Sequence, residues 1–211
     1  MYTLYYSPGT ASLVVHQALL EIGIPYRLEK VDFDRDAQHS PEYLRLNPRG
    51  QVPTLVIDGT PYFESAALLM ILADRHPEAG LAPPPGSELR ATWYQWMVFF
   101  SNAFGSTYRC WFYPPDLGAA EHPPAVRDAL REKIETSWAL VDAHLQLHGP
   151  YVLGAQFSVA DLLATMYMRW SRNMPRPALE WPALRRLADL VRGRPSWERL
   201  YEIEGLTDWR A

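Results

Sequence analysis

Two hydroxyl side chains stand where an expected strand gives way to an expected helix, in the run Tyr5-Tyr6-Ser7-Pro8-Gly9-Thr10-Ala11-Ser12. The amide groups and the positive dipole end of a helix N-terminus stabilise an anion, including a thiolate. Thr10 and Ser12 would add hydroxyl donors at that place. In the alternative interpretation, one of them only caps the helix, a role that suits Ser12. Tyr5 and Tyr6 are further candidates, but strand alternation sends them to opposite faces, so at most one reaches the site.

A proline opens an expected strand in the run Gly50-Gln51-Val52-Pro53-Thr54-Leu55. Proline donates no amide hydrogen and forces the preceding Val52 into extended geometry. If the Val52–Pro53 bond were cis, the Val52 amide and carbonyl would face outward and could pair with an extended peptide. The alternative is an ordinary proline between a loop and a strand.

A third motif, Phe63-Glu64-Ser65-Ala66-Ala67, also lies where an expected strand ends and a helix begins. The helix amides and the Ser65 hydroxyl suit a carboxylate, and Glu64 suits an ammonium. A ligand with both groups on one carbon, the end of an α-amino acid, would satisfy both. In the alternative interpretation, Ser65 only caps its own helix.

The order of expected elements positions these three motifs. A strand at 2–6, a helix from Ser12 to Gly23 and a strand at 26–33 make a βαβ unit with parallel strands. A short helix follows Ser40-Pro41, with Ser40 as its cap. A strand at 53–57 turns at Asp58-Gly59 into a strand at 61–63, and a helix covers 65–76. The first part is therefore predicted as α/β, in the order βαβ-ββα.

The second part of the chain reads as helices broken by prolines. Residues 81–87, which precede it, are rich in proline and glycine, a composition typical of a stiff connector. Helices are expected at 87–112, at 124–147, from Ser158, at 182–192 and at 196–203. The run Ser158-Val159-Ala160-Asp161 is a capping box with Asp in place of the usual Glu.

Composition excludes several classes of function. The 211 residues are 48% apolar and carry a net charge of −4, which favours a folded domain and argues against a general nucleic-acid binder. No apolar run approaches the ~20 residues that span a membrane, and residues 1–6 lack the basic start of an export signal. A single cysteine, Cys110, forbids an internal disulfide and fits a cytoplasmic location. No metal site is expected.

Together, in this order, the motifs resemble those of the cytosolic glutathione transferase family, most of all its bacterial members near the beta class. The motifs are 5–9, 47–55, Glu64-Ser65 and 157–161, and the resemblance covers essentially the whole chain. It implies a thioredoxin-like, glutathione-binding domain at 1–80, a linker at 81–88 and an all-helical domain at 89–211. It also implies a homodimer.

The resemblance assigns roles to single residues. The Val52–Pro53 bond is expected to be cis, with Val52 pairing with the cysteinyl backbone of glutathione. Glu64 and Ser65 would hold the γ-glutamyl end, with help from Gln51. His39 matches a position that touches the glycyl carboxylate, although a histidine in a loop is often only solvated. Ser158 and Asp161 match folding signals rather than catalysts, in keeping with their capping pattern.

The chain departs from the beta-class pattern at Ala11, where that class carries a cysteine. Mixed-disulfide chemistry through this position is therefore lost. What remains is Thr10, at the place where serine-type members keep their catalytic hydroxyl, together with Ser12, Tyr5 and Tyr6. A free thiol titrates near 8.5, and a hydroxyl hydrogen bond plus helix amides would lower that value by about one to two units. The thiolate would then attack an electrophile.

The second substrate is expected to be a small hydrophobic electrophile held by the helical part. Aromatic residues crowd the helix at 87–112, and most of them would equally suit a core or a dimer interface. Tyr108, Arg109 and Tyr113 are the preferred pocket residues, because polar tips beside an apolar patch are typical of ligand sites. Cys110 reads as a small buried hydrophobe.

Three functions remain open on the sequence alone. The first is a glutathione transferase that conjugates the thiolate to the electrophile, acting in detoxification. The second is a glutathione-dependent isomerase, dehalogenase or peroxidase, which would use the same thiolate. The third is a glutathione-binding protein without turnover, an alternative kept open by the missing cysteine and by threonine in place of serine.

Overall fold

The computed structural model describes residues 1–210, which form two compact units. The first unit comprises Met1–Ala82 and the C-terminal segment that begins at Arg192, and the second comprises Pro83–Val191. The contacts thus group the last helix with the first unit, whereas the sequence predicted one helical domain over 89–211. Each unit is described by itself below.

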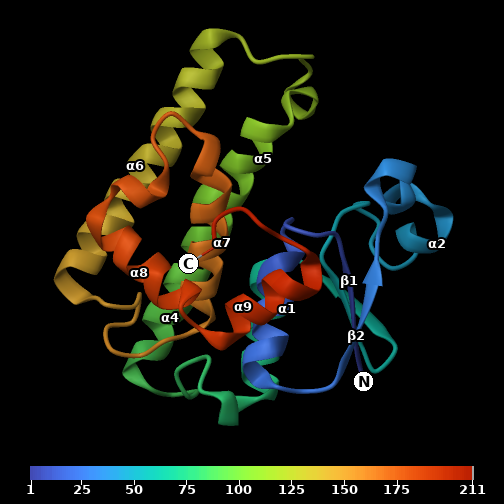
Figure 1. Cartoon of the computed structure of the whole chain (residues 1–211), viewed down its shortest axis with the longest axis horizontal. Helices are drawn as coiled ribbons and strands as arrows, with labels where there is room; N and C mark the ends of the chain where they lie inside the picture. The colour runs from blue at the N-terminus through green and yellow to red at the C-terminus, as the bar shows by residue number, and fades with distance from the viewer. Residues whose placement is uncertain (211) are drawn as a thin grey trace. The chain divides into compact units, whose positions relative to one another are not determined.

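A four-stranded sheet with the order β2-β1-β3-β4 organises the first unit (Figure 1). Strands β1 and β2 are parallel, and β1–β3 and β3–β4 are antiparallel, which confirms the predicted thioredoxin-like βαβ-ββα order. The strands are β1 (Tyr2–Tyr6), β2 (Tyr26–Lys30), β3 (Thr54–Ile57) and β4 (Thr60–Phe63). Strand β2 ends three residues before the predicted bound of 33, because Asp32 caps a 3-10 turn at Phe33–Arg35 by accepting the Asp34 amide.

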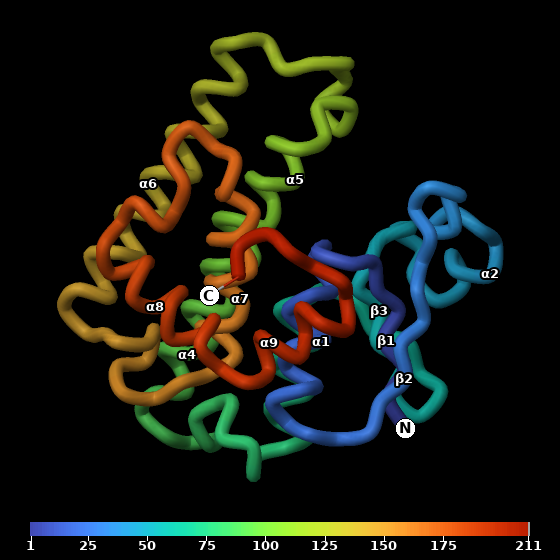
Figure 2. The backbone as a smooth tube through the Cα atoms, viewed as in Figure 1, coloured from blue at the N-terminus to red at the C-terminus, as the bar shows by residue number. Residues whose placement is uncertain are grey.

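Helices α1 (Ser12–Ile22) and α3 (Ser65–Arg75) pack against each other and against the strands. Helix α1 ends where predicted, because Gly23 takes the left-handed conformation (φ 75°) and its amide donates to the Leu19 carbonyl. Helix α9 (Pro195–Glu204) lies beside α1, so the two ends of the chain share one core (Figures 1 and 2).

A short helix, α2 (Pro41–Leu44), braces the loop before β3. Ser40 caps it as predicted, because its hydroxyl accepts the Tyr43 amide at 3.2 Å. The Tyr43 ring is buried with Val31 and Val52, and Tyr5 packs against this cluster. The cluster therefore joins the sheet to the loop that carries Val52.

The second unit consists of helices around an aromatic core. The elements are α4 (Glu88–Phe99), a π-helical segment (Phe100–Gly105), α5 (Ser106–Phe112), α6 (Pro124–His148), α7 (Val159–Trp170) and α8 (Pro182–Arg192). The predicted helix at 87–112 is thus interrupted by the π-helical segment. Phe100, Phe104 and Trp138 are buried, and the rings of Phe104 and Trp138 lie 3.9 Å apart.

The predicted capping box opens α7. The Asp161 carboxylate accepts the amides of Val152 and Ser158, both at 2.8 Å, and the Ser158 hydroxyl accepts the Ala160 amide. Both side chains are fully buried, so the box satisfies amides that water cannot reach. Among residues 1–210, no helix is long and apolar enough to cross a membrane.

Candidate active site at one end of the sheet

The register of the sheet brings the three predicted motifs together. Thr54 lies opposite Tyr5 on one side and opposite Phe63 on the other. The end of β1, the start of β3 and the end of β4 therefore share one edge of the sheet. The loop at 7–11, the Val52–Pro53 step and Glu64-Ser65 all continue from this edge.

The loop between β1 and α1 is organised around the Ser7 carbonyl. The hydroxyl oxygens of Thr10 and Ser12 lie 2.7 and 3.0 Å from this carbonyl and 2.9 Å from each other. The Ser7 amide donates to the Ser12 hydroxyl. Two hydroxyls thus share one acceptor, so either proton can satisfy the Ser7 carbonyl while the other stays available.

The two hydroxyls differ in exposure. Ser12 is fully buried, whereas Thr10 is partly exposed. Ser12 does not cap α1: the capping position is Ala11, and the Ser12 amide itself lies 3.4 Å from the Thr10 hydroxyl. A ligand at this edge therefore meets Thr10 before Ser12.

Tyr6 lies on the α1 side of β1, with its ring edge-on to His16 at 6.0 Å. Tyr5 points elsewhere, against Tyr43, as alternation along the strand predicts. Burial, and then the negative charge of Glu204, raise the pKa of the Tyr6 hydroxyl. Tyr6 therefore stays protonated at neutral pH.

The Val52–Pro53 peptide bond is cis, as predicted. Within the described residues, no hydrogen bond of the protein occupies the Val52 amide or carbonyl. The residues on either side are held in place, because the Gln51 carbonyl accepts the Tyr43 hydroxyl at 2.6 Å and the Asn47 side-chain amide at 2.8 Å. The loop thus presents the Val52 amide as a donor and the Val52 carbonyl as an acceptor, and the contacts of Gln51 hold both in place.

Glu64 has a strained backbone with φ 74°, a conformation that non-glycine residues rarely adopt. Its half-exposed carboxylate pairs with Arg49 at 2.8 Å. The first intrahelical bond of α3 runs from the Leu68 amide to the Glu64 carbonyl, so the amides of 65–67 precede it. The Ser65 hydroxyl donates to the Ala11 carbonyl at 3.2 Å, which ties the start of α3 to the start of α1.

His39 and Gln51 lie beside this edge of the sheet. The His39 ring contacts Asp36 at 2.6 Å and is more than half exposed. It also lies against Gly50, where an added Cβ would meet the ring at 2.7 Å and where φ is 60°, a conformation that favours glycine. His39 is thus positioned beside the Val52 loop and remains open to solvent.

The three predicted electrophile residues lie in the second unit. Tyr108 is fully buried in the aromatic core, 3.3 Å from the Trp138 indole nitrogen, and burial strongly raises its pKa. It is therefore a core residue in this structure and does not reach a surface. Arg109 and Tyr113 are partly exposed and stack, with the guanidinium 3.8 Å from the ring. Asp116 pairs with Arg109, which lowers the pKa of that carboxyl.

Sequence reasoning missed two residues with direct contacts at the site. Arg49 holds Glu64, and Glu204 of α9 accepts the Gly9 amide at 2.9 Å. Arg49 belongs to the motif at 47–55, and its charge opposite Glu64 was a usable signal. Glu204 lies 195 positions from Gly9, so no local pattern could reveal the contact.

The comparisons with known proteins agree with this geometry. The family model for the glutathione S-transferase N-terminal domain matches residues 11–75. Glutathione S-transferase GstA of Escherichia coli O157:H7 is 31% identical over 171 residues, covering 80% of this chain and 81% of that protein. Glutathione S-transferase GST-4.5 of Xanthomonas campestris pv. campestris is 34% identical over 178 residues, covering 81% and 82%.

A solved structure extends the match to nearly the full chain. The sphingomonad glutathione S-transferase complexed with glutathione has a TM-score of 0.85 and 30% identity, covering 97% of this chain and 100% of that one. The resemblance predicted from the motifs is therefore confirmed, and the chain belongs to the glutathione S-transferase family.

Proposed function

We propose that this enzyme conjugates the glutathione thiolate to small hydrophobic electrophiles and that Thr10 activates the thiol. The observation that carries the proposal is the meeting of three features at one sheet edge: the Thr10 hydroxyl, the unoccupied main chain of Val52 and the strained Glu64. The family membership supports glutathione as the co-substrate, since a neighbouring structure contains it.

Glutathione is an extended tripeptide, and each of its parts has a counterpart here. Val52 pairs with the cysteinyl backbone through its amide and carbonyl. The amides that open α3 receive the α-carboxylate of the γ-glutamyl end, and the Ser65 hydroxyl joins them when its proton turns from the Ala11 carbonyl toward the ligand. Glu64 receives the ammonium beside it while it stays paired with Arg49. Gln51 and His39 flank the remaining length of the peptide.

Thr10 activates the sulfur by donating a hydrogen bond. When the Thr10 proton turns toward the sulfur, the Ser12 hydroxyl at 3.0 Å satisfies the Ser7 carbonyl. Ser12 therefore acts as a support for Thr10, because its buried hydroxyl compensates the bond that Thr10 gives up. A donated hydrogen bond favours the thiolate and, together with the amides at the start of α1, lowers the thiol pKa by about one to two units from 8.5.

The electrophile is proposed to meet Arg109 and Tyr113, whose stacked side chains offer an apolar face beside a cation. Tyr108 is left out because its ring is enclosed in the core.

The assembly and setting are proposed as a cytoplasmic homodimer with a role in detoxification. The large apolar side chains of Tyr94 and Val98 are exposed one turn apart on helix α4, so they share one face. Exposed apolar residues that gather on one element are typical of a protein–protein interface. A second copy of the chain would remove them from water.

The test is the pKa of the glutathione thiol in the complex, measured by ultraviolet thiolate absorbance against pH. A value at least one unit below the free thiol supports the proposal, and a panel of aryl halides, epoxides and unsaturated carbonyls then identifies the electrophile. Bound glutathione with an unshifted thiol, and no turnover with any member of the panel, would support a binding protein instead.

A further inference from the structure

We infer that Glu204, near the C-terminus, is a positioning residue for the thiol-activating loop. It would act by anchoring the Gly9 amide next to Thr10. The inference rests on the proposed function, because it assigns Glu204 a part in the activation of glutathione. Glu204 lies in α9, outside all the motifs that the sequence presents.

The two oxygens of the Glu204 carboxylate have separate partners. One oxygen, Oε2, accepts the Gly9 amide at 2.9 Å. The other, Oε1, lies 2.8 Å from Nδ1 of His16 in α1. The second ring nitrogen of His16 lies 2.9 Å from the Tyr26 hydroxyl in β2. A chain of polar contacts therefore runs from the sheet through α1 and α9 to the loop.

Burial at the centre of this chain makes its polar contacts costly to lose. The side chains of His16 and Glu204 are both fully buried. A buried carboxylate is stable only where donors surround it, and loss of one donor leaves the charge unsatisfied. The Gly9 amide is therefore held firmly, in contrast to a typical surface loop whose amides bond to water.

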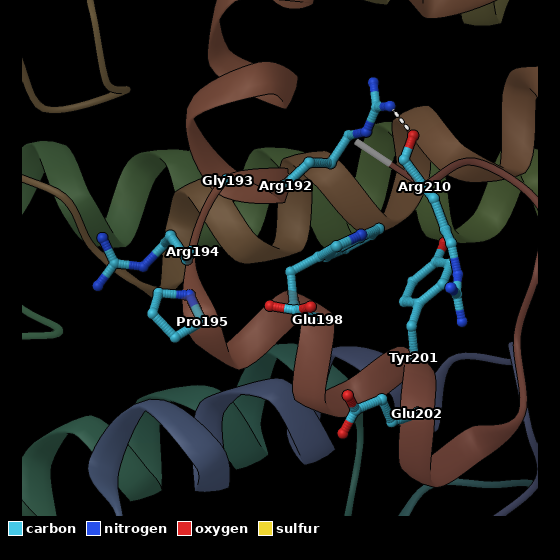
Figure 3. A pocket seen from close by; sticks show the side chains of 9 residues that line it. Arg192, Gly193, Arg194, Pro195, Glu198, Tyr201, Glu202 and Arg210 are labelled. Carbon is cyan, nitrogen blue, oxygen red and sulfur yellow. Dashed lines mark hydrogen bonds between the residues drawn. The ribbon is translucent and has the colours of Figure 1, made fainter.

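Glu204 lies on a different face of α9 from the acidic residues Glu198 and Glu202. Ser196, Leu200 and Glu204 recur every four residues, so they share the α9 face that packs on α1. Figure 3 shows Glu198 and Glu202 beside a different feature, a pocket of about 390 Å³ at the C-terminal end. Glu202 pairs with Arg199 and is half exposed.

The anchor controls the hydroxyl by its position in the chain. Gly9 has φ 69°, a conformation open to glycine, and it directly precedes Thr10. The Thr10 and Ser12 hydroxyls both depend on the Ser7 carbonyl two residues before Gly9. A shift of the Gly9 amide therefore moves the whole hydroxyl pair relative to a bound sulfur.

The test compares Glu204→Gln with the matched control Glu202→Gln, which makes the same change on a surface pair. Glutamine fills the same volume but has one acceptor oxygen and no charge, so it holds the Gly9 amide less firmly. We expect Glu204→Gln to lower kcat about five- to tenfold with KM for glutathione within about twofold, and to raise the bound thiol pKa by about half a unit or more. Glu202→Gln should match the wild type in all three.

A second readout keeps the test decisive if activity is low. The Gly9 amide resonance in the ¹⁵N spectrum should shift in Glu204→Gln and stay in place in Glu202→Gln. A wild type that fails to lower the thiol pKa would overturn the proposed function, and the amide shift would still decide whether Glu204 positions the loop. A folded Glu204→Gln with the wild-type thiol pKa, kcat and Gly9 resonance would overturn the inference.

Discussion

At the scale of single residues, the structure distinguishes Thr10 from Ser12 by exposure, whereas the sequence could not decide which hydroxyl activates the thiol. Thr10→Val keeps the shape of the side chain and removes its donor, so we expect the bound thiol pKa to rise by about one unit, which is about 1.4 kcal/mol of lost thiolate stabilisation. At pH 7, a rise of one unit from about 6.5–7.5 lowers the thiolate fraction about three- to eightfold, so we expect kcat to fall by a similar factor. Ultraviolet titration and steady-state kinetics measure both effects.

Ser12→Ala is the comparison for that change. It removes a buried group that bonds to both the amide and the carbonyl of Ser7, so we expect about 1–3 kcal/mol of lost stability and a smaller change in thiol pKa than in Thr10→Val. If Ser12→Ala abolished the thiol shift and Thr10→Val left it unchanged, the assignment of Thr10 would be wrong.

Tyr6 gives a separate prediction about pH. Burial and the charge of Glu204 raise its pKa above the usual 10, so Tyr6 stays protonated from pH 6 to 9. The rate should rise with pH in that window because the thiol, and not Tyr6, loses its proton. We expect the midpoint of the rise to be unchanged in Tyr6→Phe, measured as log kcat/KM against pH. A displaced midpoint would show that Tyr6 bonds to the sulfur.

At the scale of elements, local patterns predicted most of the fold. The Gly23 stop of α1, the Ser40 cap of α2 and the capping box of α7 were all found. Each of these depends on a few neighbouring residues, which is why the sequence suffices. The cis Val52–Pro53 bond was left open by its own residues and was predicted only by the family resemblance. The π-helical interruption of the helix at 87–112 was missed. It ends at Gly105, which lies so close to Tyr167 of α7 that an added Cβ would meet the Tyr167 hydroxyl at 2.8 Å, and local sequence patterns carry no information about such a contact.

The capping box of α7 gives a prediction about stability. Asp161→Ala would leave the Val152 and Ser158 amides buried without an acceptor, so we expect a loss of about 3–5 kcal/mol in the free energy of unfolding. Urea denaturation followed by circular dichroism measures it. Ser158→Ala removes a single cap and should cost about 1 kcal/mol. Equal effects of the two changes would contradict the central place of Asp161.

At the scale of the whole molecule, the C-terminal helix was the main surprise. Sequence composition placed residues 196–203 with the other helices, but α9 packs on α1. Arg194 pairs with Glu21 at 2.6 Å, and Gln17 donates to Ser196. These contacts join residues more than 170 positions apart, and periodicity along the chain carries no information about such pairs. The loop at 7–12 thus depends on α9, which lies far from it in the sequence.

A truncation tests this dependence. Deleting residues 193–211 would uncover the buried His16 and Gln17 of α1, so we expect the melting temperature to fall by about 10 °C or more. The control removes only 207–211 and keeps α9 with Glu204, and its melting temperature should fall by a few degrees at most. Equal melting temperatures for the long deletion and the full chain would show that α9 contributes nothing to the first unit.

The exposed apolar side chains of α4 carry the last prediction, which concerns self-association. Val98 is 57% exposed and lies one turn from the exposed Tyr94, on the same face of this helix. Val98→Asp would bury an unpaired charge in the proposed interface, so we expect the dimer to weaken at least about tenfold, or 1.4 kcal/mol. Sedimentation velocity over a range of concentrations measures the change. Leu147, which is 80% exposed on α6, supplies the control, because Leu147→Asp should leave the dimer intact. A Val98→Asp protein that sediments as a dimer at the same concentrations as the wild type would place the interface elsewhere.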